Sequence, residues 1–360
     1  MKTYKNLWEK FIEEDNFRLA YKNAIKKKSR QKQIRCFQKD EENNLSALRN
    51  MVANGEFCTS QYKEKKIYEP KERIIYKLPF APDRIVQHAI MNILKPILTN
   101  LLIENTCACI EGRGPLKASI KCSEYVRKYK YCLKCDISKF YPSINQRILS
   151  EKFHRIIKDV RFMEILDDVI YSFPGGRNCP IGNYCSQWFG NYYLSFLDNY
   201  ILHSLKCGAY ERYCDDFMLF SNDKKFLGQC KKDIGIYLNS ELGLEYSKAD
   251  IFSTKQGVDF VGYRHFKKYV LIRKSTSKRI KRRMRNIEGS IDNAEDIKRI
   301  EGQLASAHGI LKHACSNHFR KSIHLDEMQN RIKALKKGEF NASKIQDNII
   351  RPNRGRHKAD

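Results

Sequence analysis

The hydrophobic positions of the chain follow a helical period in its first part and a strand period further on. The two apolar stripes of the first 55 residues are Leu7, Trp8, Phe11 and Ile12, and then Leu45, Leu48, Met51 and Val52. Their spacing of three and four predicts amphipathic helices. From Tyr68 the pattern changes, and residues 68–94 predict a short strand, a loop punctuated by proline and an apolar helix.

Further along, buried strands alternate with long helices. Residues 130–144 predict a buried strand that leaves through Asp136 into a turn with proline, and residues 180–202 predict a loop that opens a long helix. A hairpin follows, with "YERY" leading in and "FMLF" leading out, and then a helix and further strands to Leu271. Residues 273–285 keep an apolar stripe under a basic surface, which predicts a packed helix with a cationic outer face.

Charge narrows the function class. The 360 residues contain 68 Lys and Arg against 41 Asp and Glu, a net charge of +27. Such an excess indicates a polyanionic partner, first of all nucleic acid and second a membrane surface. No apolar stretch is long enough for a spanning helix, and the N-terminus lacks the apolar core of a signal peptide. We therefore expect a cytoplasmic protein of two or three subdomains without a membrane partner.

The cysteines do not indicate a metal site. Thirteen cysteines in such a chain are most simply reduced thiols packed as small apolar side chains. Cys132 and Cys135 have the CxxC spacing of a zinc ligand pair, but they fall on a strand, and no second pair follows at the required distance. We therefore expect no zinc.

Adjacent carboxylates in the hairpin raise a sharper question. Asp215 and Asp216 stand between Tyr213-Cys214 and an apolar strand, where a tight turn is the simplest explanation. The alternative is a divalent metal site, because Asp136 also ends an apolar strand and neighbouring strands could present the carboxylates side by side. An acidic cluster on a basic protein would repel phosphates unless metals bridged the two, which is the arrangement of two-metal phosphoryl transfer.

Four segments, which follow one another along the chain in the family's order, resemble the motifs of reverse transcriptases. They are "YCDD", similar to the Tyr-X-Asp-Asp motif; "CDISKFYPSI", similar to the first aspartate motif; "PKERIIYKLPFAPDRIVQHAI", similar to the fingers segment; and "GVDFVGYR", similar to the hairpin that grips the primer. The resemblance covers roughly residues 60–275. It implies an α+β right-hand polymerase fold with fingers, an antiparallel palm sheet and a helical thumb.

The resemblance implies the following boundaries and metals. The N-terminal extension and fingers span 1–130, interwoven with a palm at 131–272, followed by a thumb at 273–345 and a basic disordered tail at 346–360. Two Mg²⁺ ions, with Mn²⁺ as the alternative, are expected at Asp136, Asp215, Asp216 and the Ile137 carbonyl. Taken alone, Asp136 could equally be a turn or helix-capping residue.

Nucleotide contacts follow from the same resemblance. Arg73 is expected to hold the triphosphate, with Lys71 and Arg84 as alternatives and a plain surface charge as a third interpretation. Tyr141 would exclude the ribose 2′-hydroxyl, or be a core aromatic. The further expected contacts are Ile181, Gly182 and Gln187, whereas Ser186 and Asn191 lie on the same helix. Lys248 would protonate pyrophosphate, although a surface lysine fits it equally well.

The primer-template contacts are expected in the C-terminal third. They are Phe260, Gly262 and Tyr263 of the hairpin, and Lys278, Arg279, Lys281, Arg282, Arg283 and Arg285 of the basic helix. That helix could instead be a solvated face.

Residues 180–191 resemble the diversity-generating retroelement branch or its group II intron-like relatives, because Ile181-Gly182 and Ser186-Gln187 replace the commoner Gln-Gly and Ser-Pro. A departure from the family is Cys214, where Met or Ala is commoner. The branch implies an RNA-directed DNA polymerase that copies a structured template RNA with errors at template adenines. Its partners would be template RNA, the RNA/DNA hybrid, dNTPs and a small basic, oligomeric accessory protein. A retron or phage-defence enzyme and a non-catalytic RNA-binding scaffold are the alternatives.

Overall fold

The computed structural model describes residues 2–68, 72–289, 291 and 297–336. The chain divides into two compact units, residues 1–256 and 257–360. We expected the palm to continue to residue 272. The strands after Gln256 form a separate sheet that belongs to the second unit, and the palm boundary stays a prediction. The tail at 346–360 and residues 337–345 of the expected thumb lie outside the described residues.

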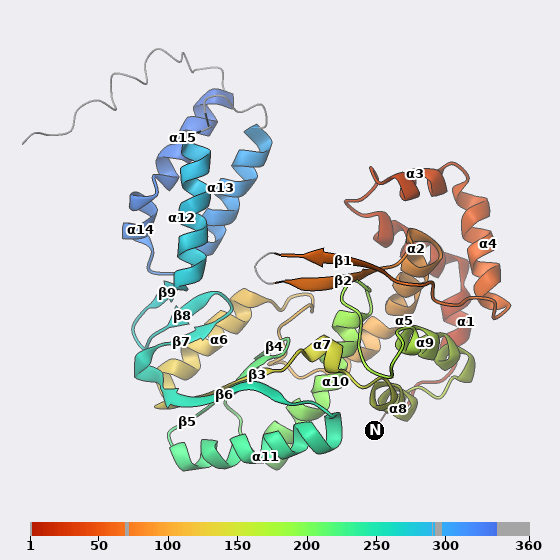
Figure 1. The fold of residues 1–360 in the computed structure, drawn as a ribbon, viewed down its shortest axis with the longest axis horizontal. Coiled ribbons are helices and arrows are strands. Elements are labelled where there is room, and N and C mark those ends of the chain that lie inside the picture. Colours follow the sequence, from red (N-terminus) through yellow and green to blue (C-terminus); the bar gives the residue numbers. More distant parts are fainter. Residues whose placement is uncertain (1, 69–71, 290, 292–296, 337–360) are drawn as a thin grey trace, which may run out of the picture. The chain divides into compact units, whose positions relative to one another are not determined.

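The N-terminal part of the first unit is helical, as the apolar stripes predicted. Its elements are α1 (Leu7–Ile12), α2 (Glu14–Ile25), α3 (Lys32–Gln38), α4 (Glu41–Ala53), the hairpin strands β1 (Lys63–Ile67) and β2 (Arg73–Lys77), the short helix η1 (Phe80–Arg84) and α5 (Ile85–Leu101). Helix α5 is buried along its length and packs against α1, α2 and α10. Figure 1 shows the β1–β2 hairpin leading out from this helical group.

A four-stranded antiparallel sheet forms the centre of the first unit. Its strands are β3 (Tyr131–Ile137), β4 (Tyr210–Tyr213), β5 (Asp216–Ser221) and β6 (Tyr246–Ser253), in the order β4-β5-β3-β6. The register pairs Cys135 with Phe217 across β3 and β5, and Asp136 with Lys248 across β3 and β6. Strand β3 is therefore an inner strand, which explains why Cys132, Leu133, Cys135 and Ile137 are buried.

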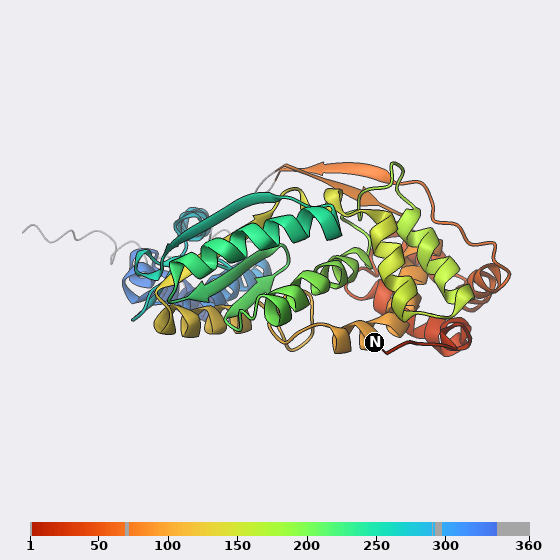
Figure 2. The same ribbon diagram turned by 90° about the horizontal axis from the view of Figure 1, so that it is seen from below.

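The first unit contains further helices, of which α6 packs on β4. They are α6 (Pro115–Lys128), α7 (Phe140–Ser143), α8 (Gln146–Ile156), α9 (Val160–Tyr171), α10 (Ser186–Asn199), η2 (Tyr200–Ser204), α11 (Lys224–Leu242) and η3 (Thr254–Gln256). Helix α11 contacts β3, β5 and β6 and runs alongside the sheet in Figures 1 and 2. It begins where the Asp223 carboxylate accepts the Lys225 N–H at 2.7 Å, and it ends at Gly243, whose φ is 59°.

The second unit has a small sheet and a helical bundle. Its elements are β7 (Val258–Phe260), β8 (Tyr263–His265), β9 (Val270–Ile272), α12 (Lys274–Glu288), α13 (Ile297–Leu311), α14 (Asn317–Ser322) and α15 (Leu325–Lys336). As the stripe predicted, Ile280, Met284 and Ile287 of α12 are buried in the core of this bundle. Among the described residues, no helix is both long and apolar enough to span a bilayer.

Candidate active site

The sheet brings the three aspartates to one end. Asp216 is the first residue of β5, and Asp215 belongs to the two-residue turn that joins β4 to β5. The β3–β5 register, continued by one residue beyond Cys135 and Phe217, places Asp136 directly opposite Asp216. The metal interpretation and the turn interpretation of this pair are therefore compatible, since Asp215 lies in a turn that faces a third carboxylate.

The pKa of the Asp215 carboxyl is raised. Burial is the main cause that raises its pKa, and the charge of Asp136 raises the pKa further. The guanidinium groups of Arg73 and Arg212 act in the opposite direction. Arg73, an exposed residue at the start of β2, thus lies within electrostatic reach of Asp215. A negative pair faced by this arginine is a suitable environment for a metal-bound phosphate.

The other two carboxylates have partners within the protein. Asp216 Oδ2 pairs with Lys134 Nζ at 3.2 Å, and Asp136 Oδ2 accepts the Ser247 hydroxyl at 2.5 Å. In the part of the chain that the structure describes, no three Asp, Glu, His or Cys side chains converge as a ready metal site. Asp136 and Asp215 fit a divalent cation, because burial and the nearby Asp136 charge make the Asp215 charge costly without one.

A buried ion pair holds the β4–β5 turn, and the sequence analysis did not predict it. Arg212 and Asp198 are both fully buried, with Arg212 Nε and Nη2 donating to the two Asp198 oxygens at 2.7 and 2.5 Å. Arg212 Nη1 also donates to the Cys214 carbonyl at 3.0 Å and to Asn191 Oδ1 at 3.2 Å. The available signal was an arginine inside the apolar strand "YERY" and an aspartate on the apolar face of the preceding helix.

This network assigns a structural contact to Asn191. Its side-chain amide donates to the Ala108 carbonyl at 2.8 Å, while its oxygen accepts from Arg212. Cys214 has a left-handed backbone, with φ of 58°, and its thiol is hydrogen-bonded to that of Cys109. The residue that departs from the family pattern therefore packs against the loop before α6.

Tyr141 lies within electrostatic reach of Asp215. Burial is the main cause that raises the pKa of its hydroxyl, and the charge of Asp215 contributes. A Cβ added to Gly190 would lie 3.0 Å from Phe140 Cε1 and 3.2 Å from Tyr141 Cε1, so α10 presses directly on both rings. The ring is partly buried against the core. Tyr141 can therefore be a core aromatic and still stand beside the candidate site as a steric gate.

Gly182 permits a close approach, although to the protein's own backbone. A Cβ at this position would lie 2.1 Å from the Tyr76 carbonyl oxygen, and the Gly182 φ is 132°. The Tyr76 N–H donates to the Ile181 carbonyl at 2.8 Å. The loop before α10 therefore docks on β2, the strand that begins with Arg73. Gln187 is exposed at the start of α10, and the Ser186 hydroxyl donates to Pro180.

The remaining expected residues divide into three cases. Lys248 lies opposite Asp136 in the register, but its side chain is 71% exposed and pairs with Asp250 at 3.0 Å. Arg84 ends η1 and lies within electrostatic reach of Lys28 and His88. Lys71 lies outside the described residues.

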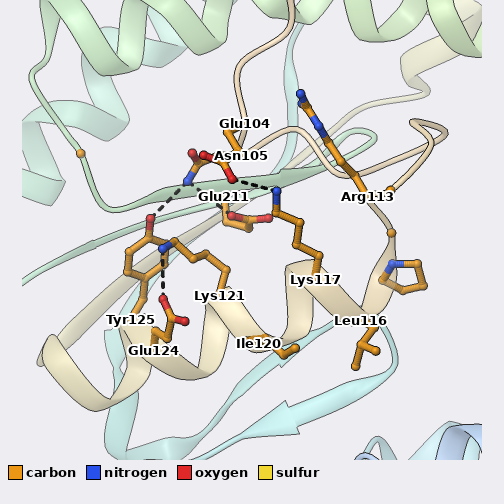
Figure 3. A pocket seen from close by; sticks show the side chains of 14 residues that line it. Glu104, Asn105, Arg113, Leu116, Lys117, Ile120, Lys121, Glu124, Tyr125 and Glu211 are labelled. Atoms are coloured by element: carbon orange, nitrogen blue, oxygen red, sulfur yellow. Dashed lines mark hydrogen bonds and ion pairs between the residues drawn. The ribbon is translucent and has the colours of Figure 1, made fainter. Parts of the chain in front are cut away.

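A cavity of about 720 Å³ lies beside the edge strand β4 and contains none of the aspartates. Figure 3 shows it between α6 and the preceding loop, with Glu211 and Tyr125 among its lining residues. Glu211 is 1% exposed, and burial raises the pKa of its carboxyl to about 8. It accepts a hydrogen bond from the Cys107 thiol at 3.0 Å.

In the second unit the expected basic contacts are exposed, whereas the expected aromatic contacts are buried. Among the described residues, no carboxylate pairs with the six cations that we expected to bind nucleic acid, namely Lys278, Arg279, Lys281, Arg282, Arg283 and Arg285. By contrast, Phe260 is fully buried, and the Tyr263 hydroxyl donates to the Ile310 carbonyl at 2.9 Å. Of the three expected hairpin contacts, Gly262, whose φ is 91°, is the one that is partly exposed.

Comparisons with known proteins place the described geometry in context. Residues 63–265 match the family profile described as reverse transcriptase (RNA-dependent DNA polymerase). A comparison with curated proteins gave no match. Among solved structures, the chain is similar to telomerase from Candida albicans, solved in complex with the TWJ fragment of telomeric RNA, at a TM-score of 0.47 and 13% identity. The similarity covers 81% of this chain and 63% of that one, so the chain spans less than two thirds of the solved chain's length.

Proposed function

The chain belongs to the reverse transcriptase family of RNA-directed DNA polymerases, with that family's mixed helix-and-strand fold and antiparallel sheets, and we propose on this basis that it copies an RNA template into DNA at Asp136, Asp215 and Asp216. The observation that carries the proposal is the mutual position of these carboxylates at one end of the sheet, with Arg73 in electrostatic reach. In the proposed reaction the primer 3′-hydroxyl attacks the α-phosphorus of a dNTP, and pyrophosphate leaves.

The protein side chains position and neutralise the reactants. Asp136 and Asp215 would hold Mg²⁺, with Asp216 and the Ile137 carbonyl as further ligands. When bound, the metal activates the attacking oxygen and stabilises the leaving group. Arg73 offers a planar guanidinium for two phosphate oxygens, while Tyr141 bounds the space beside the sugar. Lys248 is the candidate proton donor to pyrophosphate.

Primer extension tests this proposal. A DNA primer annealed to an RNA template should be extended by the purified protein with dNTPs and Mg²⁺, and extension should stop in EDTA. Mn²⁺ in place of Mg²⁺ tests the alternative ion. RNA binding without extension under all these conditions would favour the non-catalytic scaffold instead.

A finer proposal is that the enzyme belongs to the diversity-generating branch and misincorporates opposite template adenine. It rests on the resemblance of residues 180–191 to that branch, which also implies a structured template RNA and a small basic accessory protein. Ile181 supports loose selection, because isoleucine offers no hydrogen-bond donor where glutamine is usual.

Sequencing of cDNA tests the branch separately from the polymerase activity. On a template with all four bases, errors should concentrate at adenines, and Ile181→Gln should lower their rate. Equal error rates at the four bases, or rates unchanged by the substitution, would leave a plain reverse transcriptase such as a retron or defence enzyme.

A further inference from the structure

Two cationic side chains and one buried imidazole gather in the first unit. They are Lys28 in the turn after α2, Arg84 at the end of η1 and His88 on α5. Arg84 acts electrostatically on both of the others, and Lys28 acts on His88. Three segments that are separate in sequence thus bring two like charges and an imidazole to one place.

The chain does not compensate these groups. His88 is 6% exposed, and its Nδ1 has no hydrogen-bond partner among the described residues. The buried Nε of Arg84 also lacks one, and within the same residues no carboxylate forms an ion pair with any of the three. Burial is the first cause that lowers the pKa of each group, and for His88 it lowers the pKa to about 4. Uncompensated cations of this kind destabilise a protein that has no anion to bind.

The surrounding contacts fix the geometry of the cluster. The His88 ring stacks on Tyr184 at a centroid distance of 3.9 Å and an interplanar angle of 18°. Gln87 Oε1 accepts the Tyr184 N–H at 2.8 Å, which leaves the buried Gln87 Nε2 as another donor without a partner in the described chain. Tyr184 belongs to the loop that docks on β2 through Gly182, so the cluster is attached to the same loop as the candidate nucleotide site.

We propose that Lys28, Arg84 and His88 form a binding site for a phosphate group of the nucleic-acid substrate. The donor set suits phosphate, since a guanidinium, an ammonium and an imidazole can each donate to a different oxygen. The proposal rests on the proposed polymerase function for its choice of anion. Two sources share this chemistry, the backbone of the template RNA and the triphosphate of the incoming nucleotide.

Direct binding tests the site without any catalytic turnover. A fluorescein-labelled single-stranded oligoribonucleotide is titrated with the full chain, in the absence of dNTP and divalent metal, at several salt concentrations. Lys28→Ala and Arg84→Gln should each weaken binding by about tenfold and reduce the log–log salt slope by about 0.7, the value for one phosphate contact on a single strand. Lys26→Ala is the matched control, because Lys26 is exposed in the same basic turn.

A second arm measures the KM for dNTP in primer extension with the same variants. Weaker RNA binding assigns the phosphate to the RNA backbone, whereas unchanged RNA binding with a raised KM assigns it to the triphosphate. Melting temperature without ligand provides the folding control, and Lys28→Ala should raise it because one of two repelling cations is removed. Unchanged values in both arms, or an equal loss in Lys26→Ala, would overturn the site. Absence of polymerase activity alone would not, since the RNA arm does not depend on it.

Discussion

Arg212 donates to both carboxylate oxygens of Asp198, and through Nη1 it also holds the Cys214 carbonyl, one residue before Asp215. The turn with the candidate catalytic carboxylates is therefore attached to α10 by an ion pair that is fully buried. Thr106 and Tyr210 donate their hydroxyl groups to the same aspartate at 3.0 and 2.6 Å, so its oxygens are well satisfied.

Asp198→Asn should be strongly destabilising, because it leaves the Arg212 charge buried without its counter-charge. Breaking a buried pair from one side costs about 3–5 kcal/mol. The urea midpoint of unfolding measures the loss. Glu14→Gln is the control, since Glu14 is 62% exposed and its pair with Arg18 should contribute less than about 1 kcal/mol. Equal effects of the two substitutions would show that the buried pair does not hold the turn.

Tyr141→Ala should increase ribonucleotide incorporation, because removal of the ring opens space beside the sugar. Single-nucleotide extension with dNTP and rNTP measures the discrimination directly. Unchanged discrimination would place the steric gate elsewhere.

Gly190→Ala provides the opposite change at the same ring, since its methyl group would press on Tyr141 and Phe140. It should raise the KM for dNTP. Gly228→Ala on α11 is the matched control, because a Cβ there meets nothing within 4 Å. That control should leave the KM unchanged and stabilise the helix by about 0.5–1 kcal/mol.

Glu211 should make stability depend on pH. Its folded pKa of about 8 lies above the ordinary glutamate value of 4.5, so the folded state binds the extra proton between these values. The contribution is therefore complete below about pH 4.5 and is lost as pH rises toward 8, with a slope that approaches about 1.4 kcal/mol per pH unit. Glu211→Gln should flatten this part of the curve and be relatively more stable at pH 8 than at pH 5. Stability curves that fall equally with pH in the wild type and in Glu211→Gln would contradict a raised pKa of Glu211.

Arg282→Glu together with Arg283→Glu should weaken binding to an RNA/DNA hybrid and flatten its salt dependence. Each lost phosphate contact lowers the log–log slope by about 0.7 to 0.9. Lys333→Glu, an exposed lysine on α15, is the control for a general change of charge. If Lys333→Glu weakens hybrid binding as much per charge as the two α12 substitutions do, the basic surface of α12 is only a solvated face.

Much of the fold could be predicted from the sequence, because local patterns decide it. The buried strand at Tyr131–Ile137, the helix after residue 185 and the hairpin around Asp215 all form as their periodicity indicated. The position of Asp136 beside Asp215 also followed from strand order. These features depend on periodicities of two and 3.6 residues, which sequence displays directly.

The partners of the site could not be predicted in the same way. Lys134 binds Asp216 across two strands, and Asp198 meets Arg212 from a separate helix, so neither contact has a local signature. The burial of Phe260 and Tyr263 depends on the helices that pack behind their sheet. A hairpin motif alone does not show which face of the sheet, and therefore which side chains, will be buried.

Asp215→Asn in primer extension tests the central claim most directly. The substitution removes a charged ligand at the position that Asp136 and burial already make costly to ionise, so the fold should be as stable as before or more stable. We predict loss of dNTP incorporation on a primed RNA template, with RNA affinity and melting temperature retained. Incorporation at the wild-type rate in this variant would contradict the assignment of the three aspartates as the catalytic centre.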